Sequence, residues 1–279
     1  MAELGEAASW QARADGRYSG HIAEDWCQGR TAFGGLLATA AVRAMAEHIE
    51  PERRLRTVSV TFAGPVASGP VELQLEPVRA GSALSFVRAE ILQEARPRTL
   101  VCAGFGRQRE TRLAVAAPTA PAVAAPDTVA PMPDIPELTP RFAQHFDYRW
   151  TGQHAPYSGT ARPVLQGWIR PRDRAPLDAA GLLSLLDAWP PPLIARADRP
   201  LPMSSVSWQV NLLQPPPPEG LPAESWWLFE GRCQAADRGY SDSAARLWDA
   251  GGRLVAFSRQ LVAEFSVRES TAAAAGGAT

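Results

Sequence analysis

Apolar residues recur three and four positions apart directly after Gly34 and Gly35, which is the period of a helix with one buried side. Four apolar-rich segments follow this stretch. In one of them Val71, Leu73 and Leu75 alternate with polar residues, as in a strand whose sheet has one solvent-facing side. The first half of the chain therefore predicts one helix followed by antiparallel strands at 57–63, 70–79, 83–93 and 98–108.

The second half repeats this order. An apolar helix is expected at 179–189, with Asp178 as its N-cap and a run of three prolines from Pro190 ending it. Strands are expected at 204–213, 224–235, 241–249 and 253–266. The helix openings at Gly35 and Gly181 are 146 residues apart, and the following strands keep a similar offset. A duplicated unit explains this order; the alternative is two unrelated α+β units that share common patterns.

These patterns divide the chain into an N-terminal unit at 16–110, an Ala/Pro-rich linker at 111–140 and a C-terminal unit at 141–267. Repeated prolines in the linker deny the backbone the donors of helix or sheet, so an extended tether is expected. The Ala/Gly-rich residues 268–279 are expected to form a disordered tail. A helix wrapped by an antiparallel sheet, present twice in one chain, is the outline of an α+β double hotdog fold.

Composition excludes several classes of function. The chain of 279 residues is 46% hydrophobic and 20% charged with a net charge of −1, which is typical of a globular protein without a general attraction for nucleic acid. No apolar run is long enough for a membrane span, and no signal peptide is recognised. Three widely spaced cysteines predict neither disulfides nor a zinc cluster, which favours a reducing cytoplasm. The four histidines lack metal-ligand spacing, so no metal and no cofactor are expected.

Arginine supplies most of the positive charge. Three clusters have the planar guanidinium groups that suit phosphate oxygens, although ordinary solvated surface is the favoured interpretation of any one of them. They lie at 53–56, 96–98 and 170–174.

One acidic residue stands out in the second apolar helix. Asp187 lies among leucines, where a carboxylate costs free energy unless it is hydrogen-bonded or has a function. An outward-pointing Asp near the end of the helix is the alternative. The matching position of the first helix is Ala41, so only one half would carry an acid. On the strands that follow, Gln260 and Gln234 could bind a water or a carbonyl, or could be polar residues on an open sheet face.

The paired glycines that open the first helix are the third candidate. Gly34 and Gly35 would let a substrate approach the backbone, and the free N–H groups of a helix N-terminus can stabilise negative charge on a reacting oxygen. Close packing between helix and sheet explains the same glycines equally well.

Several segments together resemble the acyl-CoA thioesterase II family of double-hotdog proteins. The segments that carry the resemblance are Tyr18-Ser19-Gly20, Arg30 to Gly35, Ser59 to Pro65, Leu185-Leu186-Asp187, Ser225 to Leu228 and Gly252 to Gln260. The last of these is the most specific. The resemblance implies that an Asp, a Thr or Ser, and a Gln bind and activate one water.

Asp187 and Gln260 match the first and last of those positions, whereas an ungapped match places Gln234 where the family has a hydroxyl residue. The resemblance implies hydrolysis of an acyl-CoA or acyl-carrier thioester to a free acid and a thiol, in fatty acid metabolism. Asp187 would be the general base, Gln260 and Gln234 would position the water, and Gly34 and Gly35 would form the oxyanion site. Further assembly into a homodimer is also implied.

Two alternatives remain open. A non-catalytic protein that binds acyl thioesters, or an accessory partner, would share these residues and is favoured by the departure at Gln234. A dehydratase, the other large class of hotdog enzyme, usually needs a catalytic histidine, and neither His21 nor His48 lies in a recognisable motif of that kind.

Overall fold

The structure is a computed structural model that describes residues 2–135, 138–152, 154–173, 175–217, 219–222 and 224–266. The predicted disordered tail, 268–279, lies outside the described residues.

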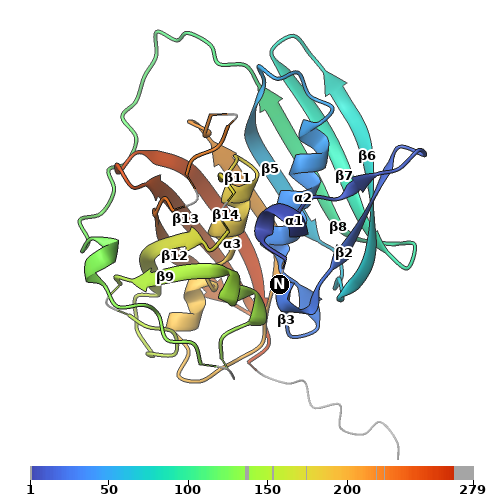
Figure 1. The fold of residues 1–279 in the computed structure, drawn as a ribbon. Helices are drawn as coiled ribbons and strands as arrows, with labels where there is room; N and C mark the ends of the chain where they lie inside the picture. The colour runs from blue at the N-terminus through green and yellow to red at the C-terminus, as the bar shows by residue number, and fades with distance from the viewer. Residues whose placement is uncertain are drawn as a thin grey trace, which may run out of the picture.

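One antiparallel sheet of twelve strands dominates the fold (Figure 1). In the first half its strands are β1 Gln11–Ala12, β2 Arg17–Ile22, β5 Arg54–Phe62, β6 Gly69–Ala80, β7 Leu84–Gln93 and β8 Arg96–Gly106. In the second half they are β9 Phe146–Trp150, β10 Val164–Pro171, β11 Met203–Leu212, β12 Trp227–Asp237, β13 Tyr240–Asp249 and β14 Leu254–Glu264. A separate small ribbon joins β3 Cys27–Gln28 to β4 Thr31–Ala32.

The strand order is mirrored about the centre of this sheet. From one edge to the other it runs β1-β2-β6-β7-β8-β5 and then β11-β14-β13-β12-β10-β9. Each half thus arranges its four-strand meander in the same way, with one further strand pair at its outer edge. All four strands predicted in each half are present, within a few residues of the expected ends.

The strands β2, β9 and β10 were not predicted. β2 carries Gly20 and β10 carries Gly167, and neither strand shows a regular alternation of apolar and polar residues. Gly167 is needed because a Cβ there would lie 2.6 Å from the ring of Trp189. At Gly167 the need for close packing therefore outweighs strand propensity, which hides β10 from a pattern-based prediction.

The two halves join where β5 pairs with β11. The register aligns Val58 with Val210 and Val60 with Trp208 on the buried face of this seam. On the open face Thr57 donates to the side chain of Asn211 at 2.9 Å. The seam is therefore part of the continuous sheet, with an apolar side and a polar side.

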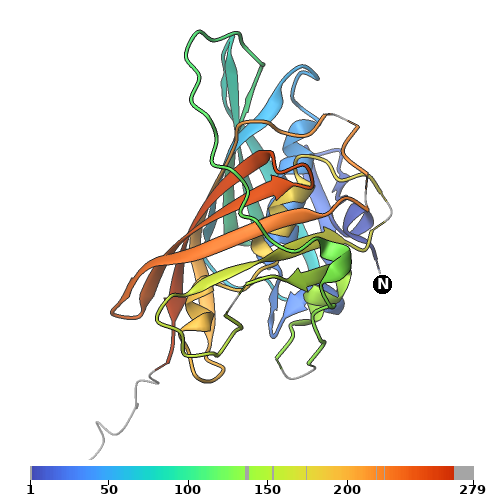
Figure 2. The same cartoon turned by 90° about the vertical axis from the view of Figure 1, so that its left-hand side faces the viewer.

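Two longer helices cover the buried face. α2, Gly34–Ala46, packs against β7 and β8, and α3, Gly181–Asp187, packs against β10 and β13; the two helices also contact each other. Figure 2 shows the sheet curving around them. A short α1, Leu4–Ala7, lies beside α2. The remaining helical segments are 3-10 turns at Glu24–Trp26, Pro126–Thr128, Arg141–His145 and Pro192–Ala195.

The linker runs along the outside of the second half, and Figure 2 shows it crossing the strands there. Ala120 and Val123 pack against a small apolar cluster that includes Trp168 and Trp248. The indole Nε1 of Trp168 donates to the carbonyl of Ala124 at 2.9 Å, and that of Trp248 donates to the carbonyl of Pro118 at 3.1 Å. These contacts attach part of the linker to the sheet of the second half.

Candidate functional site

The first helix is fixed at its N-terminus by contacts with the second half. Phe33, the extended residue before α2, stacks on Phe142 with ring centroids 4.1 Å apart. The N–H of Phe33 donates to the carbonyl of Trp26 at 2.9 Å. The glycines that follow therefore begin the helix at a defined place between the two halves.

These glycines are required by close approach. A Cβ on Gly34 would lie 2.9 Å from the Oδ2 atom of Asp187 and 2.9 Å from the ring of Phe62. A Cβ on Gly35 would collide with the ring of Phe33 and would lie 3.0 Å from the Cα of Ser184, which belongs to α3. Gly34 thus lies against the carboxyl group, and Gly35 lets the two helices cross closely.

The second helix ends at Asp187. The helix begins at Gly181 with Ala180 at its N-cap, two residues later than predicted, although Asp178 still accepts a hydrogen bond from the N–H of Gly181 at 2.7 Å. The hydroxyl of Tyr148 donates to the carbonyl of Ala188 at 3.1 Å, just beyond the last turn. Both ends of this short helix are therefore held, and the direction of the Asp187 side chain is set by the fold.

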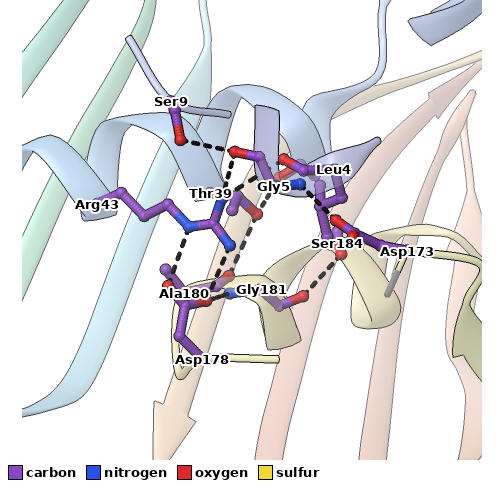
Figure 3. Close-up of polar contacts among 11 residues, drawn as sticks. Leu4, Gly5, Ser9, Thr39, Arg43, Asp173, Asp178, Ala180, Gly181 and Ser184 are labelled. Carbon is purple, nitrogen blue, oxygen red and sulfur yellow. Dashed lines mark hydrogen bonds and ion pairs between the residues drawn. The ribbon is translucent and has the colours of Figure 1, made fainter. Parts of the chain in front are cut away.

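A polar network joins the two helices (Figure 3). The hydroxyl of Thr39 on α2 donates to the carbonyl of Gly35 at 2.7 Å and to that of Ala180 at 3.2 Å. Arg43, one turn further along, forms an ion pair with Asp178 at 2.9 Å. Because these contacts connect α2 to the start of α3, they fix the position of Asp187 relative to the glycines.

Gln260 on β14 completes the group. Its Nε2 donates to Oδ1 of Asp187 at 3.1 Å and to Oγ of Ser205 at 2.8 Å. Since an ionised carboxylate can only accept, the amide nitrogen must face Asp187. Both amide hydrogens are then used, and the amide oxygen of Gln260 is left as an acceptor.

The Asp187 carboxyl has an unusual electrostatic environment. Burial among apolar residues raises its pKa to about 6, while hydrogen bonds from the backbone of Gly35 and from the side chain of Gln260 oppose the rise. The side chain still keeps some accessible surface. A carboxylate with a pKa just below neutrality is largely ionised at pH 7 and remains a useful base.

The structure brings together Asp187, Gln260, Gly34 and Gly35, as expected from the sequence. Gln234 does not join this group. It lies at a β-bulge in β12, between Cys233 and Ala235, and its side chain is exposed. The bulge adds a residue to the strand, so counting along the sequence no longer tells which face a side chain occupies.

Sequence reasoning missed Ser205, the second partner of Gln260. A bulge between Ser205 and Ser207 interrupts the pairing of β11 with β14, and the alternation of β11 therefore gave no sign that Ser205 faces Gln260. Ser243 on β13 is a further buried hydroxyl residue, and it pairs with Gln260 in the register of β13 and β14.

Comparison with known proteins identifies the family. Residues 22–106 match the model of an acyl-CoA thioesterase N-terminal domain, and residues 126–263 match that of an acyl-CoA thioesterase C-terminal domain. The chain belongs to the acyl-CoA thioesterase family. The two matched segments correspond to the two halves of the sheet, so this family assignment covers both sides of the site.

Two solved structures show the fold of this thioesterase family member. A protein of unknown function with a hot dog fold from Alicyclobacillus acidocaldarius is 22% identical, with a TM-score of 0.85 over 95% of this chain and 98% of that one. The acyl-CoA thioesterase II TesB2 of Mycobacterium marinum is 19% identical, with a TM-score of 0.75 over 94% and 97% of the two chains. No curated protein matches the chain at a significant level.

Two kinds of feature do not occur in the described part of this thioesterase-family chain. None of its described helices is long and apolar enough to cross a membrane. Among the same residues, no group of three or more His, Cys, Asp or Glu side chains could hold a metal ion.

Proposed function

We propose that this protein hydrolyses acyl-CoA or related acyl-carrier thioesters, and that its two halves are hotdog units joined as a double hotdog. The observation that carries the proposal is the meeting of a buried carboxyl, Asp187, with the amide of Gln260 and the first turn of α2. The acid comes from the second half and the helix N-terminus comes from the first. Neither half alone contains this arrangement.

Gln260 and Asp187 together can hold one water. Gln260 directs both amide hydrogens at Asp187 and Ser205, so its oxygen accepts one hydrogen of the water while the Asp187 carboxylate accepts the other. The water oxygen is then oriented with its lone pairs toward a substrate carbonyl. Ser205 supports this geometry by holding the amide, in a role that a hydroxyl residue can perform without touching the water.

The first turn of α2 supplies positive potential. The backbone of Gly35 already donates to Asp187, so the N–H of Gly34 is the donor of this turn that is left for a reacting oxygen, and the helix dipole adds to its effect. A thioester carbonyl placed against this turn gains negative charge on its oxygen during attack, and the Gly34 N–H stabilises the charge. Removing one such donor typically costs about 3–4 kcal/mol of barrier.

The reaction balances with these groups alone. The water oxygen bonds to the thioester carbon while Asp187 takes the water proton, which gives a tetrahedral intermediate. The carbon–sulfur bond then breaks, and the leaving thiolate takes the proton back from Asp187. The products are a carboxylic acid and a thiol, and Asp187 returns to its ionised form.

Thiol release from acyl-CoAs of several chain lengths tests the proposal. Asp187→Asn is expected to lower kcat by about 100-fold or more, because a general base contributes roughly 10²–10⁴. Asp242→Asn is the matched control, since Asp242 lies on the neighbouring strand β13 and pairs with Arg259 instead. Equal turnover by the wild type and Asp187→Asn would remove Asp187 from the mechanism. Tight binding of acyl-CoA by the wild type without any thiol release would instead identify a non-catalytic thioester-binding protein.

A further inference from the structure

A hollow lies at the end of the central seam where β5 begins. It has a volume of about 930 Å³ and is formed by the starts of β5 and β14, the residues after β8 and the loop after β11. Five arginines line it: Arg54, Arg56, Arg107, Arg109 and Arg253. The volume is in the range of pockets that bind small molecules.

Three of these five arginines have no carboxylate partner among the described residues. Arg107 pairs with Glu50, and Arg253 pairs with Asp249 at 2.9 Å. No described ion pair reaches Arg54, Arg56 or Arg109. Glu110 is the one carboxylate in the lining, and it forms no described ion pair with any of these arginines.

Arg56 lies at the centre of this charge. Its guanidinium donates to the carbonyls of Gly106 at 3.4 Å and Leu213 at 3.0 Å, which hold it in place without neutralising it. Burial lowers the pKa of Arg56, and the positive charges of Arg54 and Arg109 lower it further. The protein thus keeps several like charges close together, and an anionic ligand would relieve this repulsion.

The hollow is separate from the Asp187 site. Arg54 begins β5, whereas Phe62, which contacts the Gly34 position beside Asp187, ends it. At roughly 3.3 Å per residue, the nine-residue strand places them about 26 Å apart. Arg56 also lies on the open face of the sheet. Gly104 and Gly106 are two residues apart on β8 and share one face, where a Cβ on Gly104 would contact Thr57 and a Cβ on Gly106 would contact Arg56. Thr57 marks this as the open face.

We propose that Arg54, Arg56 and Arg109 form a binding site for a nucleoside diphosphate group. Guanidinium forks match phosphate oxygens in geometry. The three guanidiniums that lack a carboxylate partner carry three positive charges, which a single carboxylate would not balance. The volume exceeds what one phosphate needs. Exposed Leu84 and Leu213 in the same lining give an apolar wall for the sugar and base.

Calorimetric titration with ADP, pyrophosphate and adenosine tests this site without any need for thioesterase activity. ADP and pyrophosphate are expected to bind and adenosine is not. The double variant Arg54→Gln/Arg109→Gln is expected to weaken ADP binding by about tenfold or more. Neither side chain makes a described hydrogen bond, so the fold should survive, and a thermal melt verifies this.

The matched control is Arg199→Gln/Arg238→Gln, because both of these side chains are more than four-fifths exposed, at 84% and 92%. It should bind ADP as the wild type does. The proposal is overturned if millimolar ADP does not bind to the wild type, or if both double variants bind it equally.

Steady-state kinetics with the same variants show whether the nucleoside diphosphate group belongs to the CoA substrate or to a free nucleotide. If the site holds the nucleotide end of the CoA substrate, Arg54→Gln/Arg109→Gln raises KM for an acyl-CoA but not for the corresponding acyl-pantetheine. If it holds a free nucleotide, both KM values stay unchanged although ADP binding is lost.

Discussion

Asp187 should destabilise the folded protein at neutral pH, and replacing it with Asn tests this in a way that is independent of catalysis. Burial raises the pKa of Asp187 from 3.8 to about 6. A raised pKa in the folded state means that the protonated form fits the fold better. The stability that the fold gains from protonated Asp187 is therefore fully present below about pH 3.8 and is lost as the pH rises through about 6.

The size of the effect follows from this shift. A difference of about 2 units corresponds to about 3 kcal/mol between full protonation and full ionisation. Between pH 5 and pH 8 the folded protein loses about 1.4 kcal/mol of this amount, since the unfolded chain is already ionised at pH 5. Asn does not titrate, so the stability of Asp187→Asn minus that of the wild type should rise by about 1.4 kcal/mol over the same range.

Urea unfolding of both proteins at pH 5 and pH 8 measures this difference. Asn offers one acceptor where the carboxylate offered two, so the variant also carries a cost from its contacts with Gln260 and Gly35. That cost does not depend on pH and cancels when the two pH values are compared. For the control Asp242→Asn, the difference in unfolding free energy from the wild type should be the same at pH 5 and pH 8. If the difference in unfolding free energy between Asp187→Asn and the wild type is also the same at pH 5 and pH 8, the reasoning that burial raises the pKa of this carboxyl is refuted.

The remaining predictions concern rate and packing. The plot of log kcat/KM against pH should rise with a slope of one below about pH 6 and level off above it, because the base must be ionised. Gly35→Ala should lower stability by about 1–3 kcal/mol in urea unfolding, since its Cβ would meet the backbone of α3 at Ser184. Thr39→Val should cost about 1–2 kcal/mol in the same assay through the loss of its bond to Ala180 at the start of α3 and of its bond to Gly35 within α2. Ser205→Ala should lower kcat in a thiol-release assay by about tenfold with little change in KM, because it frees the amide of Gln260.

Periodicity was sufficient to predict the regular elements of the fold and to raise the site residues on them as candidates, whereas the family resemblance supplied their roles. Asp187 was singled out because a carboxylate interrupts an apolar helix, and Gln260 lies on the covered face of β14 because that strand keeps its alternation near it. The glycines Gly34 and Gly35 were recognised by their place at a helix start. In each case the residue and its neighbours obey one local period, so the sequence carries the information.

Irregular backbone explains what could not be predicted. The bulge beside Gln234 in β12 and the bulge after Ser205 in β11 each shift the alternation by one residue, which exchanges the two faces of the strand. A bulge depends on pairing with a distant strand and leaves no reliable local pattern. An ungapped match to the resembled family therefore selected Gln234, which lies exposed, and passed over Ser205, which reaches Gln260.

In the proposed double hotdog, one candidate acid suffices. In the first helix the position that matches Asp187 is Ala41, which is fully buried at 0% exposure. A carboxylate there would carry the same cost of burial that Asp187 bears, and a second copy of that cost would have to be offset by a second set of hydrogen bonds. Because α2 instead presents its glycine N-terminus to the acid of α3, each half specialises in one part of the site. The proposed hydrolysis therefore depends on the crossing of the two helices, which Thr39 and Arg43 hold.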